Sequence, residues 1–221
     1  MKREVIAELL DDDLGTPEEI ADSLKDLRHI NNWFGGTSTT ATLLRRVVRE
    51  TDRTELSLLE IGAGLGDVPL EACRVLAKSS IDLRVTLLDR LWSHLPRNGT
   101  SAVSGDAMRL PFRGDSFDVV SCSLFAHHFE PEALPLLAKE AMRVAKRAVL
   151  INDLIRSQLH VALVYMGLPL FASRITWHDA PASVRRAYTI AEMKSLLAGV
   201  PARRVEVSRH FLFRMGVLMW K

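Results

Sequence analysis

The sequence predicts an α/β protein with a doubly wound, mostly parallel sheet, a terminal antiparallel hairpin and a helical N-terminal cap. From residue 55 onward, short apolar segments alternate with helical segments, which is typical of parallel strands joined by crossover helices. The first apolar run, "LSLLEI" at residues 56–61, has the continuous hydrophobicity of a strand buried on both faces. The last two runs, 203–210 and 211–220, follow each other with almost no linker, which predicts a hairpin and an antiparallel sheet edge.

The first 50 residues carry helical signals and no strand signal. Helices are expected at residues 2–10, 16–30 and 38–50. The second is the best marked, because Thr16 can act as N-cap, Pro17 suits the first helical position and Glu19 completes a capping box. We therefore expect a helical cap at residues 1–52, followed by a domain at residues 53–221.

The remaining elements alternate along that domain. Further strands are expected at residues 83–89, 101–106, 117–125 and 148–153, and helices at 68–78, 131–145 and 189–199. The last helix has Thr189 and Glu192 as a capping box and Gly199 as its stop. Residues at about 154–188 form an insertion before it. The apolar side chains of this insertion either build a substrate lid or pack as core.

Composition narrows the class of protein. The 221 residues are 48% apolar and 25% charged, which is ordinary for a soluble globular enzyme, and a net charge of +2 is too small to favour nucleic acid. Cys73 and Cys122 lie in apolar settings and are expected to be free buried thiols, as in the reducing cytoplasm. The most apolar stretch, residues 161–172, is shorter than the ~20 residues of a membrane span. A cytoplasmic protein with a small-molecule substrate is expected, and its oligomeric state is left open.

Three glycines at alternate positions follow the first strand. Gly62, Gly64 and Gly66 would leave bare backbone at the carboxyl edge of the sheet, where ligands of open parallel sheets bind. A dinucleotide-binding pattern would place its third glycine at the position of Asp67, so the spacing does not match that class. Glu60, just before the loop, would repel pyrophosphate and suits a ligand with an amine and a positive centre.

Two further acids stand at the ends of the next strands. Asp89 could accept both hydroxyls of a ribose, and Asp106 could accept a hydrogen bond from the exocyclic amine of adenine. Each alone could equally cap a turn. Together with Glu60, these acids would suit a ligand that joins a nucleoside to an amino-acid tail. S-adenosylmethionine is such a ligand.

Four segments resemble, in order, the motifs of class I S-adenosylmethionine-dependent methyltransferases: "LLEIGAGLGD", "VTLLDR", "GDAMRLPF" and "FDVVSCSLFAHHF". The resemblance covers residues 55–155 and implies a Rossmann-like seven-stranded sheet whose last strand is antiparallel. It implies a cofactor site at Glu60, Gly62, Ala63, Gly64, Gly66, Asp89, Arg90, Asp106, Ala107 and Ser123. The outer segments "INNWFGG", "DLIRSQ" and "ASVRRAYTIAEM" are similar to small bacterial methyltransferases paired with type III polyketide synthases, which implies a phenolic or polyketide acceptor.

A phenolic acceptor, with a pKa of ~10, must lose its proton near neutral pH. His127 and His128 follow the fourth strand at the carboxyl edge, and we take His128 as the first candidate base and His127 as the second. Alternatively the pair only fills the turn, and His160 is a third candidate. No metal is expected, because Ser123 stands where catechol-type enzymes hold one with an aspartate, and the Cys and His spacings do not suggest zinc.

Four residues are candidates for contact with the substrate: Trp33, Asp153, Arg156 and Tyr165. Trp33 lies beside two glycines and is expected to close over the cofactor as part of a lid, or else to anchor the N-terminal helices. The predicted reaction is metal-independent O-methylation of a small apolar aromatic or polyketide hydroxyl. Two alternatives stay open, namely C-methylation of a quinone precursor and a non-catalytic module that only binds the cofactor.

Overall fold

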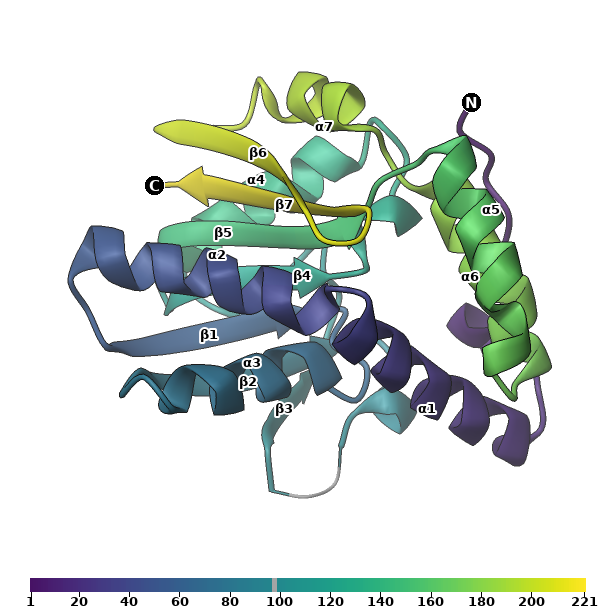
Figure 1. The fold of residues 1–221 in the computed structure, drawn as a ribbon. Helices are drawn as coiled ribbons and strands as arrows, with labels where there is room; N and C mark the ends of the chain where they lie inside the picture. Colours follow the sequence, from purple (N-terminus) through teal and green to yellow (C-terminus); the bar gives the residue numbers. More distant parts are fainter. Residues whose placement is uncertain (97–98) are drawn as a thin grey trace.

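The computed structural model describes residues 1–96 and 99–221, and in it a single seven-stranded sheet separates two helical layers (Figure 1). The strand order is β3-β2-β1-β4-β5-β7-β6. Strands β1 to β5 run parallel, whereas β7 is antiparallel to both β5 and β6. The predicted doubly wound fold with a terminal antiparallel hairpin is confirmed.

The strands match the predicted segments closely. They are β1 (Glu55–Ile61), β2 (Asp82–Asp89), β3 (Ser101–Ser104), β4 (Phe117–Ser123), β5 (Ala145–Leu154), β6 (Arg204–His210) and β7 (Arg214–Trp220). In β1, Leu58, Leu59 and Ile61 are all buried, because helices cover both faces of this central strand. The register places Glu60 beside Ser121 of β4 and Leu87 of β2.

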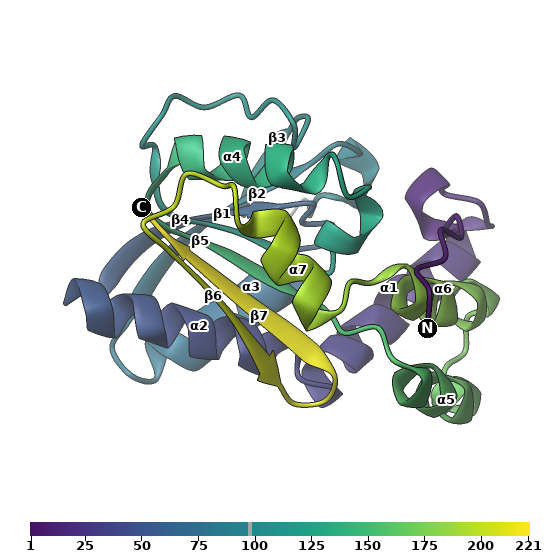
Figure 2. The same ribbon diagram turned by 90° about the horizontal axis from the view of Figure 1, so that it is seen from above.

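The helices form three groups: one on each face of the sheet and one beyond the carboxyl ends of the strands. They are α1 (Pro17–Trp33), α2 (Gly36–Thr51), α3 (Asp67–Ala77), α4 (Leu134–Val144), α5 (Gln158–Gly167), α6 (Arg174–Arg186) and α7 (Ile190–Leu197), with short 3-10 turns η1 (Leu10–Asp12), η2 (Trp92–His94), η3 (Ala126–His128) and η4 (Leu168–Leu170). Helices α2 and α3 cover one face of the sheet, and α4 and α7 cover the other (Figure 2). Helices α1, α5 and α6 gather beyond the carboxyl ends of the strands (Figures 1 and 2).

The prediction of a helix over residues 2–10 is wrong. Within residues 1–16, all of which the structure describes, the only regular element is the single turn η1. The cause is tertiary, because the backbone N–H groups of Leu9 and Leu10 donate to the two carboxylate oxygens of Asp179 at 2.8 and 3.0 Å. Helix α6 thus satisfies donors that the predicted helix would have used.

The other N-terminal helices are confirmed with modified ends. The capping box of Thr16 and Glu19 is present, and α1 runs on to Trp33 before Phe34 and Gly35 end it. Helix α2 packs against α3, β5 and β7 in the core, and so it does not belong to a cap over the carboxyl ends of the strands. The part of the predicted cap that lies beyond the strand ends is therefore the chain up to Trp33. None of the described helices has the length and apolar composition needed to cross a membrane.

Candidate active site

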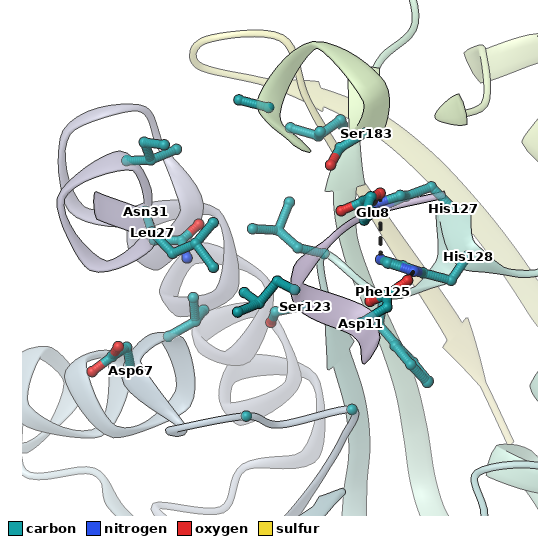
Figure 3. A pocket seen from close by; sticks show the side chains of 18 of the residues that line it. Glu8, Asp11, Leu27, Asn31, Asp67, Ser123, Phe125, His127, His128 and Ser183 are labelled. Atoms are coloured by element: carbon teal, nitrogen blue, oxygen red, sulfur yellow. Dashed lines mark hydrogen bonds and ion pairs between the residues drawn. The ribbon is translucent and has the colours of Figure 1, made fainter. Parts of the chain in front are cut away.

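A cavity of about 1130 Å³ lies at the carboxyl ends of β1, β2 and β4. Its floor consists of the loops that follow these strands, and its walls come from the N-terminal segment, α1, α5 and α6. Figure 3 shows side chains of α1, such as Asn31, on one side, and Glu8 with the two histidines on the other. The fold therefore brings together the N-terminal segment, the sheet edge and the insertion around one space.

The loop after β1 presents bare backbone to this cavity. Gly62 has φ +63° and Gly66 has φ +73°, and a Cβ atom at either position would clash with Phe125 or Leu87. A Cβ at Gly64 would meet no heavy atom within 4 Å. Two of the glycines are thus required for packing, and Gly64 leaves its backbone open to a ligand.

The two acids at the next strand ends hold turns in place. Asp89 accepts hydrogen bonds from the backbone N–H of Gly64 at 2.8 Å and of Leu91 at 3.0 Å, and Asp106 accepts one from Met108 N–H at 2.8 Å. Each carboxylate keeps further acceptor capacity, because an ionised carboxylate has about four lone-pair sites. Both acids line the cavity, and their predicted contacts with ribose and adenine stay predictions.

Glu60 is deeply buried at this edge of the sheet, with 1% of its surface exposed. Burial raises the pKa of Glu60 to about 7, although a hydrogen bond from the Ser121 hydroxyl opposes this shift. The Ser121 hydroxyl donates to it directly. A positive charge bound nearby would lower the pKa of Glu60 and favour its ionised form.

The predicted cofactor residues gather at the cavity. All of them line it except Gly66, whose absent side chain makes room for Leu87 instead.

His127 sits on η3 between two carboxylates, with 2% of its surface exposed. Its Nδ1 lies 2.7 Å from Asp153 Oδ1, and its Nε2 lies 3.4 Å from Glu8 Oε1. Burial alone would lower the pKa of His127, but Asp153 and Glu8 raise it to about 10. His127 therefore keeps its proton at neutral pH. A protonated ring cannot accept a proton, so His127 does not suit its predicted role as the second candidate base.

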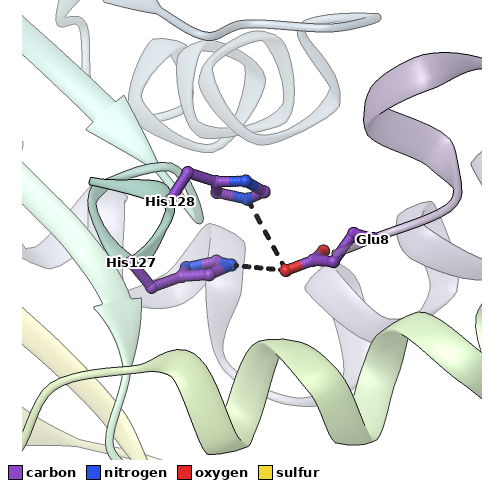
Figure 4. Close-up of side chains that lie close together, drawn as sticks. All are labelled: Glu8, His127 and His128. Atoms are coloured by element: carbon purple, nitrogen blue, oxygen red, sulfur yellow. Dashed lines mark ion pairs between the residues drawn. The ribbon is translucent and has the colours of Figure 1, made fainter. Parts of the chain in front are cut away.

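His128 has a different setting in the same cluster (Figure 4). Its Nδ1 lies 2.9 Å from Asp11 Oδ2, and its Nε2 lies 3.9 Å from Glu8 Oε1. Because Nδ1–H can donate to Asp11, Nε2 is left able to accept a proton. Burial raises the pKa of Glu8, but the two histidines outweigh this and lower it.

The nitrogens of both histidines and the Glu8 oxygen lie within 4.8 Å of one another, a spacing that a divalent cation could also bridge. The expectation of a metal-free site stays a prediction.

The comparisons with known proteins agree on one domain type. Residues 59–151 match the family model described as a methyltransferase domain. Over 99 residues the chain is 31% identical to the uncharacterized methyltransferase YcgJ of Bacillus subtilis (strain 168), an alignment that covers 43% of this chain and 38% of that protein. The chain thus spans about two fifths of the length of this relative.

Residues 59–151 are thus similar to a methyltransferase domain.

Solved structures match over nearly the whole chain, at low identity. The plantazolicin methyltransferase BpumL, in complex with a monoazolic desmethylPZN analog and SAH, has a TM-score of 0.69 and 14% identity, with 97% of this chain and 94% of that chain covered. A SAM-dependent methyltransferase from Thermotoga maritima has a TM-score of 0.63 and 12% identity, with 92% and 97% covered. These similarities confirm the Rossmann-like fold.

Two of the predicted substrate residues lie outside the cavity. Trp33 is 59% exposed and stacks on His29 at 5.2 Å, so its predicted position near the reacting centre is not observed. The next residue, Phe34, lines the cavity in its place. Tyr165 points away and accepts a hydrogen bond from Arg185 at 3.1 Å, whereas its neighbour Met166 lines the cavity.

The other two predicted substrate residues are buried behind the cavity wall. Asp153 holds His127 by both its ring and its backbone N–H, the latter at 2.9 Å. Arg156 donates to Ala187 O at 2.6 Å and pairs with Glu192. Their hydrogen bonds therefore go to the protein, and Asp153 acts on the cluster only through His127.

Sequence reasoning missed Glu8 and Asp11, which lie in the acidic run "ELLDDD". Such a run ordinarily indicates a solvated helix face, and only the tertiary fold carries it to the histidines. The matched domain begins at residue 59, so both acids lie outside it.

Proposed function

We propose that this protein transfers a methyl group from S-adenosylmethionine to a hydroxyl of a small, largely apolar aromatic or polyketide molecule. One observation carries the proposal: the glycine loop after β1 and the cluster of Glu8, Asp11 and His128 line the same cavity. Its volume of about 1130 Å³ slightly exceeds the ~300–1,000 Å³ of ordinary ligand pockets, which leaves room for a cofactor beside an acceptor.

The residues at the glycine loop fit the proposed cofactor. Gly64 offers open backbone, Glu60 supplies a buried carboxyl that a cation would ionise, and Asp89 is held by Gly64 N–H beside the loop. When bound, S-adenosylmethionine supplies a methyl group on a positively charged sulfur. The contribution of these residues is to hold and orient that group, since in-line displacement depends on positioning.

The acceptor proton would go to His128. Asp11 fixes the ring through Nδ1 and stabilises the imidazolium that forms, while Nε2 accepts the proton from the acceptor hydroxyl. Glu8 lies between the rings, and its charge is offset by the protonated His127 on its other side. When His128 takes up the proton, the carboxylates of Asp11 and Glu8 are beside it, so the new positive charge is paired.

The insertion between β5 and α7 supports an apolar acceptor. Leu168 and Phe171 are buried there, whereas Met166 and Leu170 are exposed, and all of them line the cavity. These side chains would exclude water from the reacting atoms. The outer-segment resemblance favours products of type III polyketide synthases as acceptors, and two free cysteines fit a cytoplasmic location.

Calorimetry and turnover together test the proposal. The protein should bind S-adenosylhomocysteine and not NAD, and it should methylate members of a panel of phenols, quinols and small acids. Product mass and NMR distinguish an O-methyl from a C-methyl product. Binding of NAD alone would refute the cofactor assignment. Cofactor binding without methyl transfer across several panels would instead favour the non-catalytic module.

A further inference from the structure

Arg214, the first residue of β7, is a buried cation that lines the cavity and has an incomplete set of partners. Only 1% of its surface is exposed. Its Nε donates to Phe34 O at 3.0 Å, and its Nη2 donates to Asn31 Oδ1 at 3.2 Å. Among the described residues, Nη1 finds no hydrogen-bond acceptor, and the guanidinium is in no ion pair. Nη1 is therefore a buried donor without a partner in the described part of the chain, on a residue that lines the cavity.

The charge on Arg214 is not neutralised from within the chain. Burial lowers the pKa of Arg214 to about 10, so the guanidinium is still protonated at neutral pH. Asp153 contributes an attractive field, but its carboxylate is already hydrogen-bonded to His127. Buried charges are normally paired, because an unpaired one is strongly destabilising. An anionic ligand would supply the missing partner.

His160 adds an acceptor to the same part of the cavity wall. Its Nδ1 lies 2.9 Å from Ile155 O and must donate to it, which leaves Nε2 as an acceptor. Burial lowers the pKa of His160 to about 4, with a further contribution from Arg214, so the ring is neutral. Its ring stacks on Phe213 at 4.9 Å, which fixes its orientation beside β7. Leu154 and Leu212 supply apolar surface around this pair.

The sheet order separates this position from the proposed cofactor loop. Strand β7 is separated from β1 by β4 and β5, and neighbouring strands lie ~4.8 Å apart, so the two positions are about 14 Å apart across the sheet. His128 follows β4, between them. A molecule that reaches from His128 toward β7 would lie on the acceptor side of the cavity.

We propose that the acceptor carries a carboxylate and that Arg214 binds this group through Nη1. The acceptor is then a hydroxy acid with an apolar body, and its carboxylate orients the hydroxyl toward His128. This inference rests on the proposed methyl transfer. The same chemistry could come from the methionine carboxylate of the cofactor, and the experiment below separates the two sources.

The test uses the full chain and two pairs of probes, salicylate with salicylamide and 1-hydroxy-2-naphthoate with its amide. Calorimetry is run with and without saturating S-adenosylhomocysteine. We expect each acid to bind about tenfold or more tightly than its amide, as is typical when a charge-assisted hydrogen bond is present. Arg214→Met should abolish this preference and leave the affinity for S-adenosylhomocysteine within about twofold. Arg209→Met, at an exposed arginine of the neighbouring strand β6, is the matched control and should behave as wild type.

Two results would overturn the inference. The first is equal binding, or no binding, of acids and amides by the wild-type protein, a result that does not depend on any variant folding. The second is a loss of S-adenosylhomocysteine affinity in Arg214→Met with unchanged affinity for methylthioadenosine, which lacks the carboxylate. That pattern would assign Arg214 to the cofactor. Failure of the wild-type protein to bind S-adenosylhomocysteine at all would instead refute the proposed function. Arg214→Lys, which keeps the charge, should retain part of the preference for the acids.

Discussion

The carboxylate of Glu8 lies 3.4 Å from Nε2 of His127, which joins the N-terminal segment to the turn after β4. Asp11 makes a second such contact at 2.9 Å, with His128 Nδ1. The matched methyltransferase domain, residues 59–151, contains both histidines and neither acid. The proposed proton acceptor therefore depends on residues that the domain itself does not supply.

Replacing Glu8 with glutamine should impair turnover and spare cofactor binding. The substitution removes the negative charge that lies beside both histidines, and losses of general-base assistance are typically about 10²-fold or more. We expect kcat to fall by about that factor while the affinity for S-adenosylhomocysteine stays the same, as measured by calorimetry. Glu18→Gln, at an exposed position of α1, serves as the control. Normal turnover in Glu8→Gln would remove Glu8 from the mechanism.

Stability should decrease at alkaline pH because of His127. Its pKa is raised from 6.5 to about 10 in the folded protein, so the stabilisation is fully present below pH 6.5 and is lost as the pH rises through about 10. We expect the free energy of unfolding to drop by a few kcal/mol over this range, measured by urea denaturation at several pH values. His127→Gln should flatten the profile, and the exposed His29→Gln should not. A wild-type profile that is flat from neutral to alkaline pH would contradict the buried pairing.

Binding of S-adenosylmethionine should release protons near pH 7. Glu60 has a pKa of about 7, so roughly half of the molecules carry a proton there, and a nearby positive charge would lower that pKa. Calorimetry in buffers of different ionisation enthalpy should detect release of up to about half a proton per site. Glu60→Gln should abolish the release, whereas Glu71→Gln, at a half-buried residue that forms an ion pair with Arg74, should preserve it. The same release in Glu60→Gln would show that another group titrates.

Chelation should leave the reaction unaffected. His127 is protonated at neutral pH, and a protonated imidazole has no free lone pair to offer to a divalent ion. We expect equal turnover before and after dialysis against EDTA. Loss of activity that Zn²⁺ restores, with the metal bound in stoichiometric amount, would show that Glu8, His127 and His128 act as ligands instead.

The sheet and the cofactor loop could be predicted because their signals are local. A buried strand such as β1 is recognisable from its own apolar run, and the conformations of Gly62 and Gly66 are properties of the turn that follows it. The capping box at Thr16 likewise depends on neighbours within a single turn. These features need no knowledge of distant segments.

The other half of the site depends on contacts between distant segments. The position of Trp33 depends on where α1 ends, because each residue turns a helix by about 100°, and the observed end places Trp33 outside and Phe34 at the cavity. Glu8 reaches the histidines because distant residues hold the N-terminal segment there, among them Asp179 of α6. Neither relationship has a signature in the local sequence.

The attachment of the N-terminal segment to Asp179 links access to reactivity. The segment is a wall of the cavity and also carries Glu8 and Asp11. Movement of this wall away from α6, to admit an acceptor or release a product, would withdraw both acids from the histidines at the same moment. Opening the cavity along this wall would therefore also remove the two acids that position the histidines.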